Sequence, residues 1–493
     1  MSGRFLVGVD VGTTSVKTGL FDVDGTLLAR RSTPVATARP AANVVEQSPG
    51  DWIEAALAGL AEVLANGPDG AVAGLGLCSQ VNTHVFVDER GEALAPAIVW
   101  QDGRAAEDAA RLDLEVPESA RIRWWGAPLP LDASHVLSRM AWMARVRPDI
   151  WRATRWVMAP KDYCLLKLTG EASADPISSF GVVDSSLRYI DDLLAIVPGA
   201  AKRLPPLSAP TKTVGRIGGG LPGAGLPMVA ATMDAWAGML GAGGAAEGAA
   251  VYLSGTSEVG GIVSGKRIPT PGVIAFPECL GITLHAGPTQ AGGASVAWLG
   301  AILGRGAEEI SELAARSDFA RSAPIFLPHL QGERAPLWDI AARASFSGLD
   351  GSMGAPELAR SVLEGVAYSV RLLLGALEAS SGVTAARLSH AGGGAQSDVW
   401  CQIRADVLGR PIDRVVNLDS GLVGAVLLAG LGTGVFPTLE EAAGRMRRVA
   451  RTFEPNPART RLHDEGFAGY KDLYARLKGF GAPGQRGPTT EPR

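Results

Sequence analysis

The same short pattern opens both halves of this sequence. An apolar run, Phe5 to Val9, leads into Asp10-Val-Gly-Thr-Thr-Ser, and a second apolar run, Ala249 to Leu253, leads into Ser254-Gly-Thr-Ser. In each case a short buried strand would enter a turn of small residues whose backbone N–H groups can surround an anion. Gly-Thr turns are common, so the weight lies in their position at the head of each half. The pattern predicts a duplicated fold with a cleft between two related halves.

The first 30 residues predict three strands joined by tight turns. Val16 to Phe21 follows the first turn, and Asp24-Gly25 is a strong hairpin signal before a third strand. A helix is expected from Pro49 to about Leu64, because apolar residues recur at spacings of three and four. Ala71 to Cys78 then has the composition of a buried strand. Strands alternating with helices predict the α/β class, with an antiparallel meander at one edge of a mixed sheet.

A joint rich in glycine and alanine, Gly241 to Gly248, predicts a domain boundary near residue 246. We therefore expect domains over residues 1–246 and 247–480, and a frayed polar tail over 481–493. In the second half, Ala355 to Ala379 has one apolar face and predicts a long helix. The uncharged stretch Gly421 to Leu439 is interpreted as a buried helix.

Composition excludes several classes of protein. Hydrophobic residues make up 46% and charged residues 19%, so the chain can build real cores and is not a disordered protein. The formal net charge is −4, and no concentrated basic face stands out, so nucleic acid is not an expected partner. Glycine is unusually frequent, with 63 of 493 residues, and its short clusters indicate places where backbone approaches a ligand or turns sharply.

The cysteines and the apolar segments bear on the compartment. Cys78, Cys164, Cys279 and Cys401 are far apart and show no metal-binding spacing. No signal peptide is recognised, because Asp10 interrupts the early apolar run, and no segment is a good membrane span. We expect a cytoplasmic protein with buried free thiols.

Asp10 and the turn after it have the chemistry of a metal–nucleotide site. A carboxylate at a strand end can hold Mg²⁺ through water, and the turn can bind phosphate oxygens. An ordinary hairpin with an acidic turn cap is the alternative.

A triple-glycine turn, Gly392-Gly-Gly-Ala-Gln-Ser, lies between the strand-like Leu388 to Ala391 and a helix. It would likewise let the backbone approach a ligand at a helix N-terminus. Flexible turns often contain such a run, so this signal is weak.

Asp234 is a single acid in an apolar stretch of small residues, Ala230 to Trp236. A buried carboxylate is costly unless something pairs or uses it. A general base and a helix N-cap are both compatible with this position.

Farther upstream, Trp100-Gln-Asp-Gly-Arg and Gln80-Val-Asn-Thr-His combine aromatic, amide, acid and basic groups that suit a hydroxyl-rich ligand. A solvated loop with one buried tryptophan is the alternative, and His84 alone is more simply interpreted as structural.

Together these motifs resemble the FGGY family of carbohydrate kinases, from Val7 to about Thr452, and its xylulokinase-like branch in particular. The resemblance is carried by the opening VGVDVGTTSVKTGLFDVDGTLL, by WQDGRA and YLSGTSEVG, by PHLQGERAPLWD with the helix that follows, and by AGGGAQSDVWCQIRADVLGRPI. It implies two actin/hexokinase-like (ribonuclease H-like) domains around a central cleft. The first would bind mainly the sugar and the second mainly ATP.

The resemblance also implies roles for individual residues. Asp234 would be the catalytic base and Asp10 the acid that organises Mg²⁺. Residues expected near ATP are Gly12, Thr13, Thr14, Lys17, Gly255, Thr256, Gly393, Gly394 and Ser397. Residues expected near the sugar are Gln80, Asn82, Thr83, Trp100, Asp102 and Arg104, besides Asp234.

The substrate implied is a small sugar with a primary hydroxyl, and a ketopentose fits the branch. That branch usually has a histidine at the position of Asn82 and an asparagine at the position of Ala235. Loss of these polar groups should change which hydroxyl pattern is accepted. A linear polyol such as erythritol, or another sugar or sugar acid, is therefore an alternative. A sugar-sensing regulator or a non-kinase ATPase of the same superfamily is an alternative of another class. Homodimers are common in the family, although no interface is recognisable here.

Overall fold

The computed structural model describes residues 4–68 and 70–480, which form two compact units. Among the described residues, unit 1 comprises 4–68, 70–245, 276–283 and 419–448, and unit 2 comprises 246–275, 284–418 and 449–480. The expected division into two continuous domains did not foresee that two later segments, Phe276–Thr283 and Asp419–Arg448, belong to unit 1. The expected tail, residues 481–493, lies outside the described residues.

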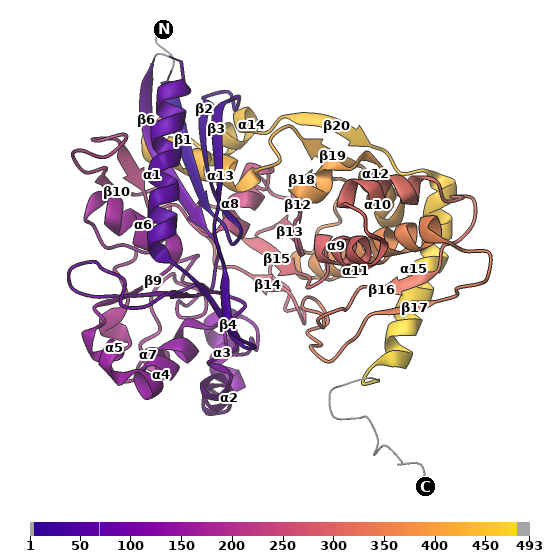
Figure 1. Cartoon of the computed structure of the whole chain (residues 1–493), viewed down its shortest axis with the longest axis horizontal. Coiled ribbons are helices and arrows are strands. Elements are labelled where there is room, and N and C mark those ends of the chain that lie inside the picture. The colour runs from indigo at the N-terminus through magenta and orange to yellow at the C-terminus, as the bar shows by residue number, and fades with distance from the viewer. Residues whose placement is uncertain (1–3, 69, 481–493) are drawn as a thin grey trace. The chain divides into compact units, whose positions relative to one another are not determined.

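A six-stranded sheet forms the centre of unit 1 (Figure 1). In order across the sheet the strands are β10 (Thr213–Arg216), β11 (Pro227–Val229), β6 (Ala71–Ser79), β1 (Arg4–Val11), β2 (Ser15–Asp22) and β3 (Leu27–Pro34). β1, β2 and β3 form the expected antiparallel meander. β6 runs parallel to β1, β11 runs parallel to β6, and β10 closes the edge antiparallel. The mixed α/β class is confirmed.

Helices from distant parts of the sequence pack on this sheet. α1 (Pro49–Asn66) packs on β2 and β3, and α6 (Pro160–Thr169) packs on β6. α13 (Ser420–Gly432) packs on β1 and β6 and also on α8 (Asp234–Gly241). The approach of α13 is close, because a Cβ built at Gly76 would lie 2.1 Å from the carbonyl oxygen of Ala425. The expected buried helix after Gly421 exists, but it ends at Gly432.

Unit 2 repeats the topology of unit 1. Its sheet contains, in order, β14 (Ile274–Ala275), β15 (Leu284–Pro288), β13 (Glu258–Val263), β12 (Ala250–Ser254), β18 (Leu388–Ala391), β19 (Ile412–Val415) and β20 (Val449–Phe453). β15, β13 and β12 form an antiparallel meander, β18 and β19 continue parallel, and β20 is antiparallel. This is the order and sense of β3-β2-β1-β6-β11-β10, so the predicted duplication is confirmed.

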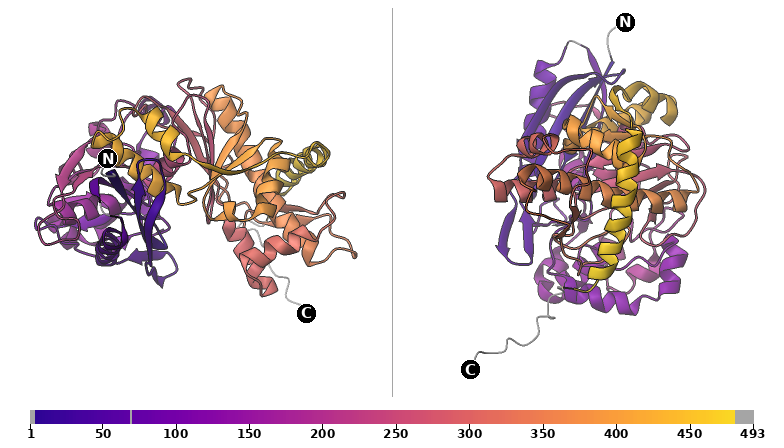
Figure 2. Two further views of the ribbon diagram at one scale, coloured as in Figure 1. Left: turned by 90° about the horizontal axis from the view of Figure 1, so that it is seen from above. Right: turned by 90° about the vertical axis from the view of Figure 1, so that its right-hand side faces the viewer.

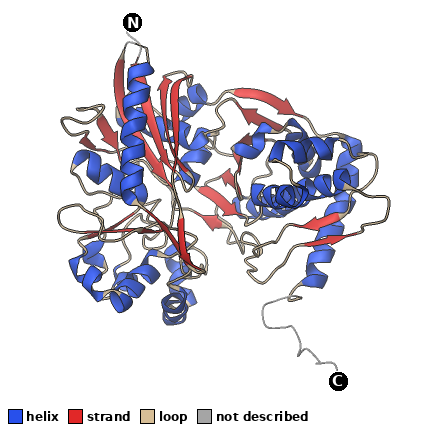
Figure 3. Cartoon of the chain, in the orientation of Figure 1, coloured by secondary structure: helices blue, strands red, loops and turns tan. Residues whose placement is uncertain are grey.

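The helices of unit 2 are built around the expected long helix, α11 (Ala355–Ser381), which packs on β13 and β15 (Figure 3). α9 (Gly293–Leu303), α10 (Ala307–Ala315) and α12 (Asp398–Leu408) contact α11. α15 (Pro457–Leu477), yellow in the right-hand view of Figure 2, runs across α11 and α12. The strands β16 (Ile325–Leu327) and β17 (Ser345–Ser347) form a separate pair.

The rest of unit 1 consists of short elements. Small sheets contain β4 (Ala38–Ala41), β5 (Val44–Gln47) and β8 (Ala97–Ile98), and β7 (Val85–Val87) with β9 (Trp156–Met158). The remaining helices are α2 (Ala106–Glu115), α3 (Glu118–Trp125), α4 (Val136–Val146), α5 (Pro148–Ala153), α7 (Asp191–Leu194) and α14 (Leu439–Met446).

In the described part of the chain, all four cysteines are buried with free thiols, as expected. None of the described helices combines the length and apolar character that crossing a membrane would require.

Candidate active site

The two glycine-threonine turns occupy equivalent places in the two units. In unit 1 the turn joins β1 to β2, and Gly12 N donates a 3.1 Å hydrogen bond to Ser15 O. In unit 2 the turn joins β12 to β13, and Gly255 N donates a 3.0 Å bond to Ser257 O. Thr14, Gly255 and Thr256 are exposed, so both turns can meet a ligand.

Asp10 is the next-to-last residue of β1, and its carboxylate is oriented toward the N-terminus of α13. A Cβ built at Gly421 would lie 3.1 Å from Asp10 Oδ2, so glycine leaves room for the carboxylate there. Burial raises the pKa of Asp10, while Lys17 opposes that shift. Asp10 Oδ1 is buried and has no hydrogen-bond partner among the described residues. A buried carboxylate oxygen that lacks a protein partner suits a hard cation.

The described residues contain no cluster of three or more acidic, histidine or cysteine side chains that could hold a metal by themselves. Mg²⁺ is usually held by one or two carboxylates together with water and the phosphates of a substrate. The unpartnered Oδ1 of Asp10 could supply one such carboxylate oxygen.

Lys17, expected near ATP, is held by an acid that sequence reasoning missed. Its Nζ lies 2.8 Å from Asp419 Oδ1, and Arg30 Nη2 lies 2.7 Å from Asp419 Oδ2. Lys17 is half-buried, and Asp10 and Asp419 raise its pKa against the effect of burial. Lys17 thus keeps its charge beside Asp10, with Asp419 fixing its direction.

Asp234 is the first residue of α8 rather than its N-cap, which is Met233. Its Oδ1 nevertheless accepts a 2.7 Å hydrogen bond from Ala235 N. Burial, and next the charge of Asp10, raise the pKa of Asp234 to about 7. A carboxylate with a pKa near neutrality can accept a proton from a hydroxyl and release it again at physiological pH.

A chain of amides and hydroxyls joins the glycine-threonine turn of unit 1 to the expected sugar-side residues. Thr13 Oγ1 donates to Gln80 Oε1 at 3.1 Å and accepts from Trp100 Nε1 at 3.0 Å. Gln80 Nε2 donates to Gln47 Oε1 at 2.8 Å, and Gln47 Nε2 donates to Thr13 O at 2.6 Å. Thr83 Oγ1 completes the chain, donating to Gln80 and accepting from Trp100 N, both at 3.1 Å. Gln80 and Thr83 therefore shape the site from within.

Asn82 is the exposed member of this motif, and it has a left-handed backbone, with φ of 55°. Arg139, fully buried, donates to Asn82 O and also bonds His84 Nδ1 at 2.9 Å. The side-chain Nδ2 of Asn82 donates to Ser134 Oγ at 3.2 Å. Asn82 also lines a cavity together with the polar side chains of His84, His135, Asp162, Ser178, Ser179 and Tyr189. His84 thus has a structural partner, and Asn82 remains accessible to a ligand.

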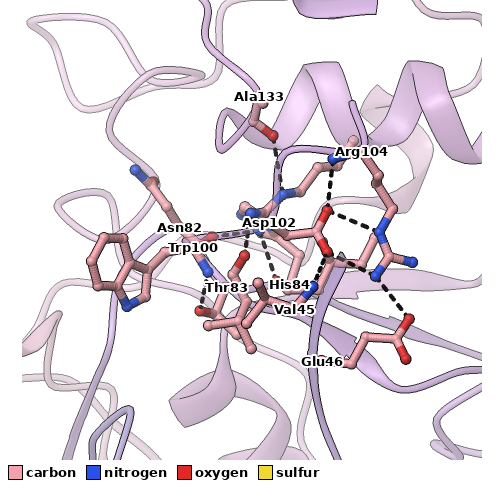
Figure 4. A network of polar contacts seen from close by, with 12 residues as sticks. Val45, Glu46, Asn82, Thr83, His84, Trp100, Asp102, Arg104 and Ala133 are labelled. Atoms are coloured by element: carbon pink, nitrogen blue, oxygen red, sulfur yellow. Dashed lines mark hydrogen bonds and ion pairs between the residues drawn. The ribbon is translucent and has the colours of Figure 1, made fainter. Parts of the chain in front are cut away.

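Asp102 and Arg104 bond to each other and to the protein (Figure 4). Asp102 accepts from Val45 N at 2.6 Å and from Arg104 Nη2 at 2.8 Å, and it is buried. Arg104 also reaches Glu46 Oε1 at 2.8 Å. Figure 4 shows the Trp100 indole projecting away from this cluster. Asp102, rather than Trp100, is the buried residue of the motif. The ion pair of Asp102 and Arg104 holds the loop that carries Trp100.

In unit 2 the triple-glycine turn follows β18 as expected. Gly392 has φ of 91°, and Gly393 to Gln396 form a single 3₁₀ turn before α12. Ser397 Oγ caps α12 by accepting from Trp400 N at 3.1 Å. A Cβ built at Gly394 would lie 2.1 Å from Ser254 Oγ, so glycine permits the close approach of the two turns of unit 2.

Arg404, which the sequence did not single out, ties these two turns together. It is fully buried and donates to Gly394 O at 2.9 Å and to Ser254 Oγ at 2.6 Å. Glu258 Oε1 lies 3.3 Å from Arg404 Nη2 and supplies the opposing charge. No local pattern marks Arg404 or Gln47, because most of their partners are distant in sequence. Asp419 had one local signal, its position before a glycine-rich helix.

Comparisons with known proteins cover nearly all of the chain. Residues 5–241 match the model of the N-terminal domain of the FGGY family of carbohydrate kinases, and residues 250–433 match that of its C-terminal domain. A xylulose kinase from Staphylococcus epidermidis is 27% identical, covering 97% of this chain and 98% of its own. A glycerol kinase from Geobacter sp. is 32% identical, covering 95% and 97%. The structure of a xylulose kinase from Rhodospirillum rubrum is 27% identical, with a TM-score of 0.85 over 97% and 99% of the chains.

Proposed function

The chain belongs to the FGGY family of carbohydrate kinases and is an ATP-dependent sugar kinase, and on that premise we propose that it phosphorylates a primary hydroxyl of a ketopentose. The full-length similarity to xylulose kinases supports this choice of acceptor. The single observation that carries the chemistry is Asp234, a half-buried carboxylate with a pKa of about 7 at the start of a helix.

Asp234 would act as the general base. Its carboxylate accepts the proton of the acceptor hydroxyl as that oxygen bonds to the γ-phosphorus of ATP, while the bond to the β-phosphate oxygen breaks and ADP leaves. Burial favours this role, because a desolvated carboxylate with a pKa near 7 is a stronger base than one in water.

The remaining sites would hold the nucleotide and its metal. We assign phosphate contacts to Gly12, Thr13, Thr14 and Lys17 in unit 1 and to Gly255 and Thr256 in unit 2, and we place Gly393, Gly394 and Ser397 at the border of the nucleotide. Asp10 would hold Mg²⁺ through its unpartnered oxygen. Mg²⁺, when bound, neutralises charge on the transferring phosphate. Unit 1 would thus bind mainly sugar, and unit 2 mainly ATP.

The acceptor would lie against Asn82 and Trp100, whose side chains are exposed and half-buried, respectively. The other expected sugar-side residues form hydrogen bonds within the protein, and their contribution would be to fix the shape of this surface. They are Gln80, Thr83, Asp102 and Arg104.

A linear polyol is the second candidate acceptor, favoured by two observations. The Geobacter relative named a glycerol kinase is 32% identical over nearly the whole chain. The residue after the base is Ala235, which offers only a methyl group, and Asn82 offers an amide in place of the imidazole usual in the xylulokinase-like branch. A site with fewer fixed polar partners loses less when the substrate has fewer polar groups, and a short polyol lacks the carbonyl of a ketopentose.

A coupled assay of ADP release with Mg-ATP tests the proposal, using D- and L-xylulose, D- and L-ribulose, gluconate, glycerol and erythritol. We expect one ketopentose to give the highest kcat/KM. A polyol as the best acceptor would replace the first candidate with the second. No acceptor above the background ATPase rate would contradict both candidates.

Two matched substitutions sharpen this assay. Asn82→His and Ala235→Asn, separately and together, restore the groups usual in the xylulokinase-like branch. If these positions set the acceptor, the double variant shifts the preference toward D-xylulose by at least about tenfold in kcat/KM. An unchanged ranking of acceptors would show that neither side chain sets it.

A further inference from the structure

Three charged side chains are fully enclosed in unit 1 and take no part in the chemistry proposed above. They are Lys161 and Asp162, in the first turn of α6, and Asp175, in the loop that follows this helix; none is more than 4% exposed. Buried charges are expensive even when they are paired, and removing one partner leaves the other uncompensated. Their contacts indicate which part of the structure these three charged side chains stabilise.

The Lys161 ammonium contacts three neighbouring groups, through two hydrogen bonds and an ion pair with Asp175. Nζ lies 2.6 Å from Asp162 Oδ1 and 2.8 Å from Asp175 Oδ2, and it donates to Ala230 O at 3.2 Å. The backbone N of Lys161 also donates to Ser79 Oγ, at the end of β6, at 3.2 Å. Lys161 therefore ties the start of α6 both to β6 and to the segment that leads to Asp234.

Asp175 binds the same segment from its other oxygen. Asp175 Oδ1 accepts from Thr232 Oγ1 at 2.8 Å and from the backbone N of Ile177 and Ser178, both at 3.0 Å. Thr232 is fully buried and lies two residues before Asp234. The carboxylate of Asp175 thus links the lysine on one side to the threonine on the other.

Between the two anchored residues lies a strained one. Ala231 has φ of 49°, in the left-handed region that is unfavourable for a residue with a Cβ. Ala230 is held through its carbonyl by Lys161, and Thr232 is held through its hydroxyl by Asp175. Such a conformation persists only where the surroundings impose it. The ion-paired group contacts the residues on both sides of Ala231, at the turn from β11 into α8, and the backbone N of Ala230 and of Ala231 also donate to Lys212 O and Pro210 O.

We propose that Asp175, held by Lys161, is a positioning residue for phosphoryl transfer: through Thr232 it fixes the turn that delivers Asp234 to the acceptor. The inference rests on the proposed role of Asp234 as the base. Asp175 and Lys161 touch neither the acceptor nor the nucleotide in this scheme. Their effect is confined to the placement of one carboxylate, where small displacements reduce rates strongly.

The test uses Thr232, because replacing Lys161 or Asp175 would leave a buried charge unpaired and could unfold the chain. Thr232→Val removes the hydroxyl but keeps the shape, and Thr232→Ser keeps the hydroxyl. Thr154→Val is a matched control, since Thr154 is a buried threonine of unit 1 whose hydroxyl bonds Ile150 O at 2.7 Å. Steady-state kinetics in both substrates, melting temperature and the activity of Asp234→Asn are measured for the full chain with its best acceptor.

We expect Thr232→Val to lower kcat about 10- to 100-fold while the KM for ATP changes less than about twofold. Thr232→Ser should recover kcat to within about threefold of the parent, and Thr154→Val should leave kcat unchanged. Full activity in a folded Thr232→Val enzyme, or failure of Thr232→Ser to restore kcat, overturns the inference. An inactive Asp234→Asn beside an unaffected Thr232→Val removes only the positioning role, whereas an active Asp234→Asn removes the proposed base and this inference with it.

Discussion

The indole Nε1 of Trp100 donates a 3.0 Å hydrogen bond to Thr13 Oγ1, which joins the expected sugar-side loop directly to the glycine-threonine turn of unit 1. Thr13 in turn donates to Gln80, so one hydroxyl serves both segments. The two motifs are 87 residues apart in sequence. A shift of the Trp100 side chain would therefore displace Thr13 or break its hydrogen bond, in the turn that we assign to the transferring phosphate.

We predict that Trp100 and Thr13 act as a coupled pair. Trp100→Phe and Thr13→Val should each lower kcat/KM for the acceptor, and the double variant should be little worse than the worse single variant. Side chains in contact typically show interaction energies of about 0.5–3 kcal/mol. A double-mutant cycle measures this coupling. Trp156→Phe, at a half-buried tryptophan of the same unit, provides the control cycle with Thr13→Val. Equal additivity in both cycles would contradict the coupling.

The pH dependence of the reaction should report Asp234. Its pKa is raised to about 7, first by burial and then by Asp10, so the carboxyl is protonated below that pH and cannot accept a proton. The expected kcat/KM for the acceptor rises with pH, about tenfold per unit below 7, and levels off above it. Initial rates between about pH 5 and pH 9 measure the profile. A profile that is flat across neutrality, or falls there, would argue against Asp234 as the base.

The metal requirement should depend on Asp10. Asp10→Asn keeps the shape but removes the charge that we assign to Mg²⁺, so the Mg²⁺ concentration for half-maximal activity should rise at least about tenfold. Asp24→Asn is the control, because Asp24 is an exposed acid at the turn before β3. Titration of activity with Mg²⁺ at fixed ATP measures both variants. If the two variants need the same Mg²⁺ concentration, Asp10 is not the metal residue.

Arg404 should contribute to both stability and nucleotide affinity. Arg404→Met leaves Glu258 buried without its opposing charge, a change that typically destabilises a protein by about 3–5 kcal/mol. The double variant Arg404→Met/Glu258→Gln should regain much of that stability, since the uncompensated charge is gone. Urea unfolding measures both.

The same two variants separate stability from nucleotide binding. The KM for ATP should stay raised in the double variant, because the contacts of Arg404 with Gly394 and Ser254 remain lost. A KM for ATP that returns with stability would contradict a role for Arg404 in shaping the ATP turns. The KM for the acceptor serves as the internal control.

The elements that the sequence predicted are those with a strong local signature. The meander at the N-terminus, the strand at Leu388 to Ala391 and the long helix from Ala355 were recognisable, because alternation, turn residues and helical periodicity act over a few residues. The equivalent positions of the two glycine-threonine turns followed from the same local pattern. The helix after Gly421 was expected to be longer, and its apolar composition did not reveal where Gly432 ends it.

The sequence by itself determined the family motifs, the paired turns and the two acids, Asp10 and Asp234, because each is written in adjacent residues. Only the tertiary structure decided that Asp419 pairs with Lys17 across 402 residues, and that Asp175 and Lys161 contact Thr232 and Ala230, just before Asp234. The physical reason is that a buried charge must find its partner in space. Which partner it finds depends on how helices such as α13 pack on the sheet, and the neighbouring sequence does not specify that arrangement.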